Sequence, residues 1–166
     1  MAFQMGLDKL TNVTFKRKFR WLFSIENIIG GSVNALLPHK GARPSLTFKS
    51  QAFEHINETI SFPVKPEWKP ISVILYDTKC NMNPIWENWL KPFYNPKDGM
   101  YNFIIDANYK KNATLTMLDG CGNIMESWTF ENAYPEEINF DELDMSSNDI
   151  VNITLSLKYD RAYFND

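Results

Sequence analysis

The sequence has little of the residues from which catalytic and metal centres are usually built. Two histidines (His39, His55) and two cysteines (Cys80, Cys121) occur in 166 residues, and none has the close spacing of a transition-metal site. Nucleophile-elbow, phosphate-loop and zinc-protease motifs are also absent. We therefore expect no enzyme, no metal and no cofactor, although sequence alone leaves a cysteine–histidine nucleophile pair open.

The sequence also lacks long hydrophobic runs. No stretch of 18 apolar residues is present, so we expect no transmembrane helix. The N-terminus lacks the apolar segment and cleavage site of a secretory signal. We therefore expect Cys80 and Cys121 to be reduced thiols, with a disulfide as the alternative. For the same reason, the four Asn-x-Thr triplets are expected to be chance matches rather than glycosylation sites.

Aromatic residues, in contrast, are plentiful: 12 Phe, 7 Tyr and 5 Trp. They favour strands, and the chain contains many short alternating runs. At this length we expect one domain, 1–166, with a sizeable core. About eight strands and one short helix predict an all-β protein, a sandwich or barrel with a flanking helix.

The charge is unevenly distributed. Residues 1–80 carry 11 Lys and Arg against 6 Asp and Glu, whereas residues 81–166 carry 6 against 14. Between Asn123 and Leu157 there are eight acidic residues and no basic one. The two halves could attract each other within the fold, or the basic end of one subunit could meet the acidic face of a neighbour. Such complementarity sets orientation and register.

The stretch from Ile124 to Arg161 contains the clearest strand patterns. Alternate residues from Val151 to Tyr159 are apolar, which is typical of a strand with one buried face. A second strand is predicted over Ile124–Tyr134, and Pro135 is expected to end it. Residues 111–134 should form a hairpin around the turn 119–123. The side chains expected in the core are Trp21, Trp86, Trp89, Trp128, Phe130, Tyr134, Leu155, Leu157 and Tyr159.

One short helix is predicted over residues 83–94. Asn83 is a suitable N-cap and Pro84 a suitable first helical residue. Trp86 and Trp89 would lie on one apolar stripe. A helix of three turns is too short to be stable alone, so it should pack on the sheet, on a neighbouring subunit or on both.

Two segments are expected to project from the core. Residues 1–18 form an N-terminal arm that ends in a basic cluster, and four such charges on a mildly acidic protein are weak support for nucleic-acid binding. Residues 27–66 combine a long loop (27–44) with strands Ser45–Phe53 and Thr59–Val64. That hairpin is either a solvated edge or a projection that pairs with another subunit.

The C-terminal half resembles the tail tube proteins of contractile-tailed bacteriophages. The pattern W-x-F-x-N-A-Y-P-x-x-I begins at Trp128, and F-x-x-L-D-x-S-S-N-D-I-V-x-x-T-L-x-L-x-Y-D begins at Phe140 and ends at Asp160. More weakly, the order of elements agrees over residues 15–161. The resemblance implies two packed antiparallel sheets with a flanking helix.

The resemblance also implies a function and partners. Six subunits would close into a ring, and rings would stack into a hollow tube through which DNA passes. Partners would be further copies of the chain, the tail sheath protein, and baseplate initiator and tail terminator proteins. The location would be the virion, after assembly in the host cytoplasm. Alternatives are a tube-initiating baseplate protein, the tube of a type VI or extracellular injection system, and, on residue patterns alone, a monomeric ligand-binding barrel.

The arm and the segment 27–66 are then the expected contacts between rings, and the acidic residues after Tyr134 are expected to set the polarity of stacking. Whether the polar face of the last strand lines the lumen stays open. The residues predicted at assembly interfaces are Lys16, Arg17, Lys18, Arg20, Glu54, Glu58, Glu136, Glu137, Asp141 and Glu142.

Overall fold

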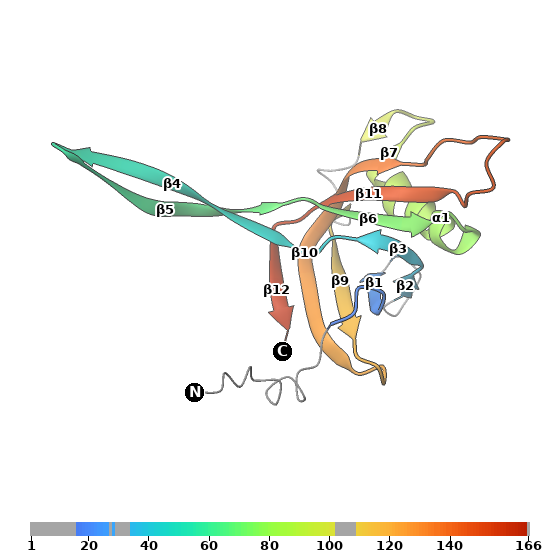
Figure 1. Cartoon of the computed structure of the whole chain (residues 1–166). Helices are drawn as coiled ribbons and strands as arrows, with labels where there is room; N and C mark the ends of the chain where they lie inside the picture. The colour runs from blue at the N-terminus through green and yellow to red at the C-terminus, as the bar shows by residue number, and fades with distance from the viewer. Residues whose placement is uncertain (1–15, 27, 29–33, 102–108, 166) are drawn as a thin grey trace, which may run out of the picture.

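One long strand, β10 (Ile124–Asn139), belongs to both layers of the fold. The structure is a computed structural model that describes residues 16–26, 28, 34–101 and 109–165. The first part of β10 pairs with β9 and β12, and its last part pairs with β11 (Figure 1). All pairings are antiparallel, and the strand order is β2-β1-β9-β10-β11-β6-β3, with β12 on β10.

The first sheet consists of β1 (Trp21–Ile25), β2 (Asn34–Leu36), β9 (Lys111–Leu118), the first part of β10 and β12 (Arg161–Asn165). The second sheet consists of β3 (Pro38–Gly41), β6 (Ile71–Tyr76), the end of β10 and β11 (Asn152–Lys158). With the helix at one side, this confirms the predicted all-β class, two packed antiparallel sheets with a flanking helix. The strand β12 was not predicted.

Pro135 does not end its strand, so that prediction was wrong. Asn132 has φ +54°, and the register with β9 shifts between Phe130 and Ala133. A second shift with β11 follows between Pro135 and Glu137. Such bulges bend a strand and tolerate a proline, so β10 turns from one sheet into the other instead of stopping.

The first bulge also changes which face of β10 is buried. Phe130 is buried before it, and Ala133 and Pro135 are buried after it. Tyr134 therefore does not share the face of Phe130, and its predicted place in the core was wrong. Its half-buried ring lies against Tyr109, 6.1 Å between centroids, outside the main core.

The core lies between the two sheets. The alternation predicted for the last long strand is confirmed, because Ile153, Leu155 and Leu157 are fully buried. The ring of Tyr159 packs against Phe130, with 5.0 Å between their centroids. Each such large side chain contributes about 1.5–3 kcal/mol on burial. Trp21 and Trp128 are partly buried and pack against this core.

The helix begins earlier than the sequence predicts. Thr78 is the N-cap, and α1 spans Lys79–Ile85 with Pro84 inside it. A π-helical segment, η2 (Trp86–Leu90), and a short α2 (Lys91–Phe93) follow. Trp89 is buried and donates to the Tyr109 carbonyl at 2.8 Å. Trp86 lies at the surface near Phe140, contrary to its predicted place in the core, because the wide π turn offsets the two indoles.

The predicted loop 27–44 contains two strands in its described part. β2 and β3 lie at opposite ends of the strand order, and only Leu37 separates them. The chain therefore passes from one sheet to the other at Leu37. At Gly41 in β3, a β-carbon would lie 2.7 Å from the Trp21 indole, so this close approach requires glycine. Residues 27 and 29–33 lie outside the described residues, as do most of the arm and 102–108.

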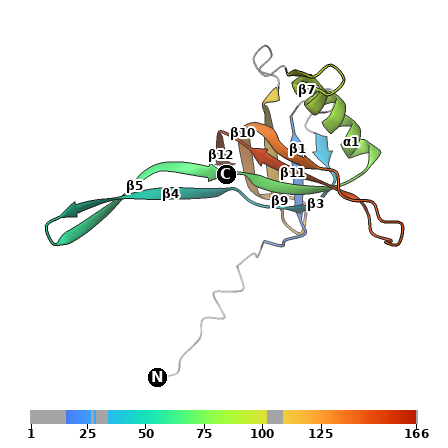
Figure 2. The same ribbon diagram turned by 90° about the horizontal axis from the view of Figure 1, so that it is seen from above.

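The strands β4 (Ser45–His55) and β5 (Glu58–Lys69) form a hairpin that extends far from both sheets (Figures 1 and 2). Within the described part of the chain its two strands pair only with each other, from Ser45 opposite Lys69 to His55 opposite Glu58. Both strands are longer than predicted. A small pair, β7 (Tyr94–Asn95) and β8 (Met100–Tyr101), completes the described fold.

Candidate assembly surfaces

The projecting hairpin exposes several large apolar side chains to solvent in the monomer. Near its tip, Phe53 and Ile60 are directly opposite each other and are 57% and 58% exposed. Phe62 belongs to the same face, and Ile56 at the turn is 90% exposed. Exposed apolar surface on a long two-stranded projection marks an interaction site, because such a hairpin is at best marginally stable alone.

A buried carboxylate holds the start of the described chain against the first sheet. Glu126 is 2% exposed and accepts hydrogen bonds from Lys16, from Arg43 at 3.2 Å and from the Trp128 indole at 2.5 Å. Burial would raise the pKa of Glu126, but these hydrogen bonds and the Arg43 charge outweigh it and hold the pKa below 4.5. Glu126 thus joins β10 to the end of the arm and to the β3–β4 connection.

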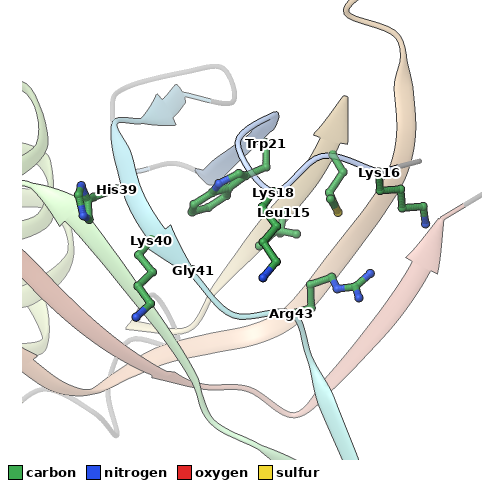
Figure 3. A pocket seen from close by; sticks show the side chains of 9 residues that line it. Lys16, Lys18, Trp21, His39, Lys40, Gly41, Arg43 and Leu115 are labelled. Atoms are coloured by element: carbon green, nitrogen blue, oxygen red, sulfur yellow. The ribbon is translucent and has the colours of Figure 1, made fainter. Parts of the chain in front are cut away.

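Beside this carboxylate lies a basic cavity of about 550 Å³ between β1 and β3 (Figure 3). Trp21, Leu115 and Met117 supply its apolar surface. Lys18 and Lys40 have no ion-pair partner among the described residues. The other lining residues are Lys16, His39, Gly41 and Arg43. The cavity therefore combines an aromatic floor with a cationic rim.

The connection between β10 and β11, residues 140–151, is an acidic loop with its own hydrogen bonds. Asp144 accepts from the backbone N–H and hydroxyl of Ser146 at 2.8 and 2.7 Å, which lowers the pKa of its carboxyl group. Asp141 accepts from the Asn152 N–H at 3.1 Å. Leu143 and Met145 are fully exposed to solvent between these anchors. The loop extends beyond the end of β11 (Figure 1).

The predicted interface residues lie at several places. Glu54 and Glu58 are exposed near the hairpin tip, and Asp141 and Glu142 are in the acidic loop. Arg17 and Lys18 are exposed, whereas Arg20 is half-buried, 5.1 Å from the Phe19 ring. Within the described chain, the acidic residues of the hairpin tip, the acidic residues of the loop and the basic residues of the arm do not form one common site.

Some of the acidic residues between Asn123 and Leu157 form ion pairs with basic residues later in the chain. Glu136 lies 3.8 Å from Lys158, and Glu131 lies 3.5 Å from Arg161. Glu126 was counted among the acidic residues, but its buried role was missed. The sequence could have indicated this role, because Glu126 alternates with Trp128 and Phe130 and so lies on an otherwise apolar strand face.

Both cysteines are free and exposed in the structure. Within the described ranges, no group of three His, Cys, Asp or Glu is placed to hold a metal ion. No described helix has the length and apolar character needed to span a membrane.

Two antiparallel sheets that share one bent strand, with a flanking helix and a projecting hairpin, define a β-sandwich whose exposed apolar projection indicates a structural, assembling protein. The family model of the T4-like virus tail tube protein gp19 matches residues 68–163, more than half of the chain. The chain therefore belongs to the T4-like tail tube protein family, whose members are structural subunits of tubes. Comparison with curated proteins found no match.

Solved structures show the same fold. A chain of the anti-feeding prophage baseplate, six-fold symmetrised, has a TM-score of 0.74 at 14% identity and covers 92% of this chain and 97% of its own. A chain of the sheath–tube complex of an extracellular contractile injection system has a TM-score of 0.72 at 13% identity, with 96% and 97% covered. The SPP1 tail tube has a TM-score of 0.55 at 13% identity, with 88% and 75% covered.

Proposed function

We propose that six copies of this chain close into a ring and that rings stack into the hollow inner tube of a contractile tail. The family match over residues 68–163 carries the proposal. In this role the chain is a structural protein without an enzymatic activity. Its partners are further copies of itself, a sheath protein around the tube, and initiator and terminator proteins at the tube ends. It functions in the virion after assembly in the host cytoplasm.

Exposed sheet edges support ring formation. Among the described residues of the first sheet, β12 pairs on one side only, with β10, and β2 pairs only with β1. Unpaired edges of this kind are aggregation hazards in a free monomer, and ring closure removes them. The hairpin β4–β5 would then reach a neighbouring copy, and its apolar tip would be buried there.

We assign DNA passage to a lumen lined by short neutral side chains. On the outer face of the first sheet, Thr114 and Thr129 lie in register, and Thr116 and Ser127 form the next row. A hydroxyl surface without a free cation binds phosphate weakly, so DNA can slide. In a phage that carries Thr114→Lys and Thr129→Lys, tubes should form but DNA ejection should slow. Unchanged ejection would place the lumen elsewhere.

A tube-initiating protein and the tube of an injection system are the alternatives. Both share the fold, and identities below 15% do not separate them. Immunogold labelling of intact tails distinguishes them, because a tube subunit is labelled along the whole tube and an initiator only at one end. Particles that lack a capsid would indicate an injection system.

Electron microscopy of the purified chain, with tail initiator added if required, tests the proposal. We expect six-fold rings or tubes. Deletion of Glu54–Glu58 should leave folded subunits or rings that do not stack. Long tubes formed by that deletion variant would contradict the assigned role of the hairpin.

A further inference from the structure

The basic cavity and the acidic loop match each other in charge and in apolar character. The cavity between β1 and β3 has an apolar floor and four cationic side chains around it. The loop 140–151 carries four carboxylates and no basic residue, and it exposes four apolar side chains, of which Leu143 and Met145 are the most exposed. We propose that the acidic loop of one copy inserts into the basic cavity of a second copy in the tube.

The cationic side of the contact is available. Glu126 already accepts from Lys16 and Arg43, which fixes these two cations beside the cavity. Lys18 and Lys40 keep their charges uncompensated within the described chain. Figure 3 shows Lys18, Lys40 and Arg43 gathered around the space below Trp21. An anionic segment therefore gains two new ion pairs without displacing Glu126.

The loop is preorganised for insertion. Asp141 and Asp144 are used internally, because they accept hydrogen bonds from the backbone at Asn152 and Ser146. Glu142 has no side-chain partner among the described residues, and Asp149 accepts only from the Ser147 hydroxyl at 3.0 Å. These two carboxylates are free to meet cations. A loop that is already held in shape loses little conformational entropy on binding.

The apolar parts complement each other as well. Leu143 and Met145 project from the loop, and their burial in a cavity floored by Trp21 and Met117 removes apolar surface from water. A methionine thioether also packs favourably against an aromatic ring. The floor requires Gly41, because any β-carbon there would displace the indole. The cavity is thus built around the position of Trp21.

A second copy is the favoured occupant for a structural reason. Among the ion pairs of the described residues, none joins the loop carboxylates to a cation of the same chain. In both views the loop points outward, away from the body of the sheets (Figures 1 and 2). This inference rests on the proposed function, since it supplies one of the contacts between tube subunits.

Disulfide trapping tests the contact directly. In a background with Cys80→Ser and Cys121→Ser, we would combine Lys40→Cys with Met145→Cys, assemble the protein and oxidise it. We expect a ladder of covalent oligomers. The single variant Met145→Cys in the same background is the matched control and should give no ladder, because one cysteine per chain can join at most two chains. Monomers with an internal disulfide would overturn the proposal, because the loop would then occupy its own cavity.

Charge exchange gives an independent readout. Lys18→Glu with Lys40→Glu should reduce the assembled fraction at least ~10-fold, and so should Glu142→Lys with Asp149→Lys. The variant with all four changes should recover assembly. If the wild type assembles but no ladder forms and the charge changes have no effect, the loop contact is wrong and the tube function stands. If the wild type fails to assemble with its tail partners, both the loop contact and the tube function are contradicted.

Discussion

The side-chain amide of Asn81 makes two reciprocal hydrogen bonds with the backbone of Leu37. It accepts from the Leu37 N–H at 3.1 Å and donates to the Leu37 carbonyl at 3.2 Å, and it also donates to the Tyr76 carbonyl at 2.9 Å. Leu37 is where the chain passes from one sheet to the other. The buried amide therefore ties the helix α1 to the link between the sheets.

Replacement of Asn81 by alanine should destabilise the monomer by about 1–3 kcal/mol, because buried backbone groups at Leu37 and Tyr76 lose their partners. Urea unfolding followed by tryptophan fluorescence measures the change. The control is Asn83→Ala, an exposed position on the same helix, which should change the free energy of unfolding by less than about 0.5 kcal/mol. Equal effects of the two variants would show that the Leu37 link is not held by Asn81.

Glu126 should make stability depend on acid pH. Its pKa in the folded state is lower than 4.5, the ordinary value, so the ionised form stabilises the fold. That contribution is fully present above the unfolded pKa and is lost as pH falls through the folded pKa. Unfolding curves between pH 3 and pH 7 should therefore show a weaker pH dependence in Glu126→Gln than in the wild type. A parallel profile would contradict the ion pairs of Glu126 with Lys16 and Arg43.

The variant Glu126→Gln should also lose about 1–3 kcal/mol at pH 7, because the ion pairs with Lys16 and Arg43 are broken. Glu87→Gln is the matched control. Its carboxylate pairs with Lys91 at 2.8 Å on an exposed helix surface, and such pairs contribute little. A larger loss at Glu87 than at Glu126 would reverse the expected order of the two sites.

The apolar tip of the hairpin should matter for assembly and not for folding. Phe53→Ser with Ile60→Ser removes exposed apolar surface that only a neighbouring copy can cover. The melting temperature of the monomer should stay nearly constant, while sedimentation shows loss of large assemblies. Ile124→Ser, at another exposed apolar position, should assemble normally. Normal assembly by the hairpin variant would show that the tip is not part of an assembly interface.

Charge reversal at Glu136, Glu137, Asp141 and Glu142 should impair tube growth more than folding. All four side chains are exposed, and exposed charges contribute little to monomer stability. Electron microscopy would measure tube length, and circular dichroism would monitor folding. Glu87→Lys with Asp98→Lys, at two exposed acidic residues outside β10 and the loop 140–151, is the control. Tubes of normal length in the fourfold variant would count against an acidic stacking surface.

The sequence predicted the strands whose side chains alternate strictly. The strand expected before the turn 119–123 agrees with β9 (Lys111–Leu118), and so does the buried face of β11. These patterns are local, since burial on one face is repeated every second residue. The same reasoning failed at Asn132, where a residue with positive φ changes the parity of β10. A bulge of this kind depends on the neighbouring strands, which single-sequence patterns do not contain.

The proposed surfaces were predicted less well, for a related reason. Composition located the basic and acidic parts of the chain, but only the fold shows that Glu126 is buried and that Lys18 and Lys40 line one cavity. Thr78 was missed as the N-cap because Asn83-Pro84 has the stronger local signal. Tertiary contacts of Asn81 and Ile85 place the first helical turn earlier.

Electron microscopy of the wild-type chain assembled with its tail initiator tests the central claim most directly. The account predicts stacked rings with six-fold symmetry, a continuous lumen, and the hairpin β4–β5 of each subunit buried against another copy. Particles that remain monodisperse monomers in the presence of the initiator and sheath proteins, with the hairpin free in solvent, would contradict it.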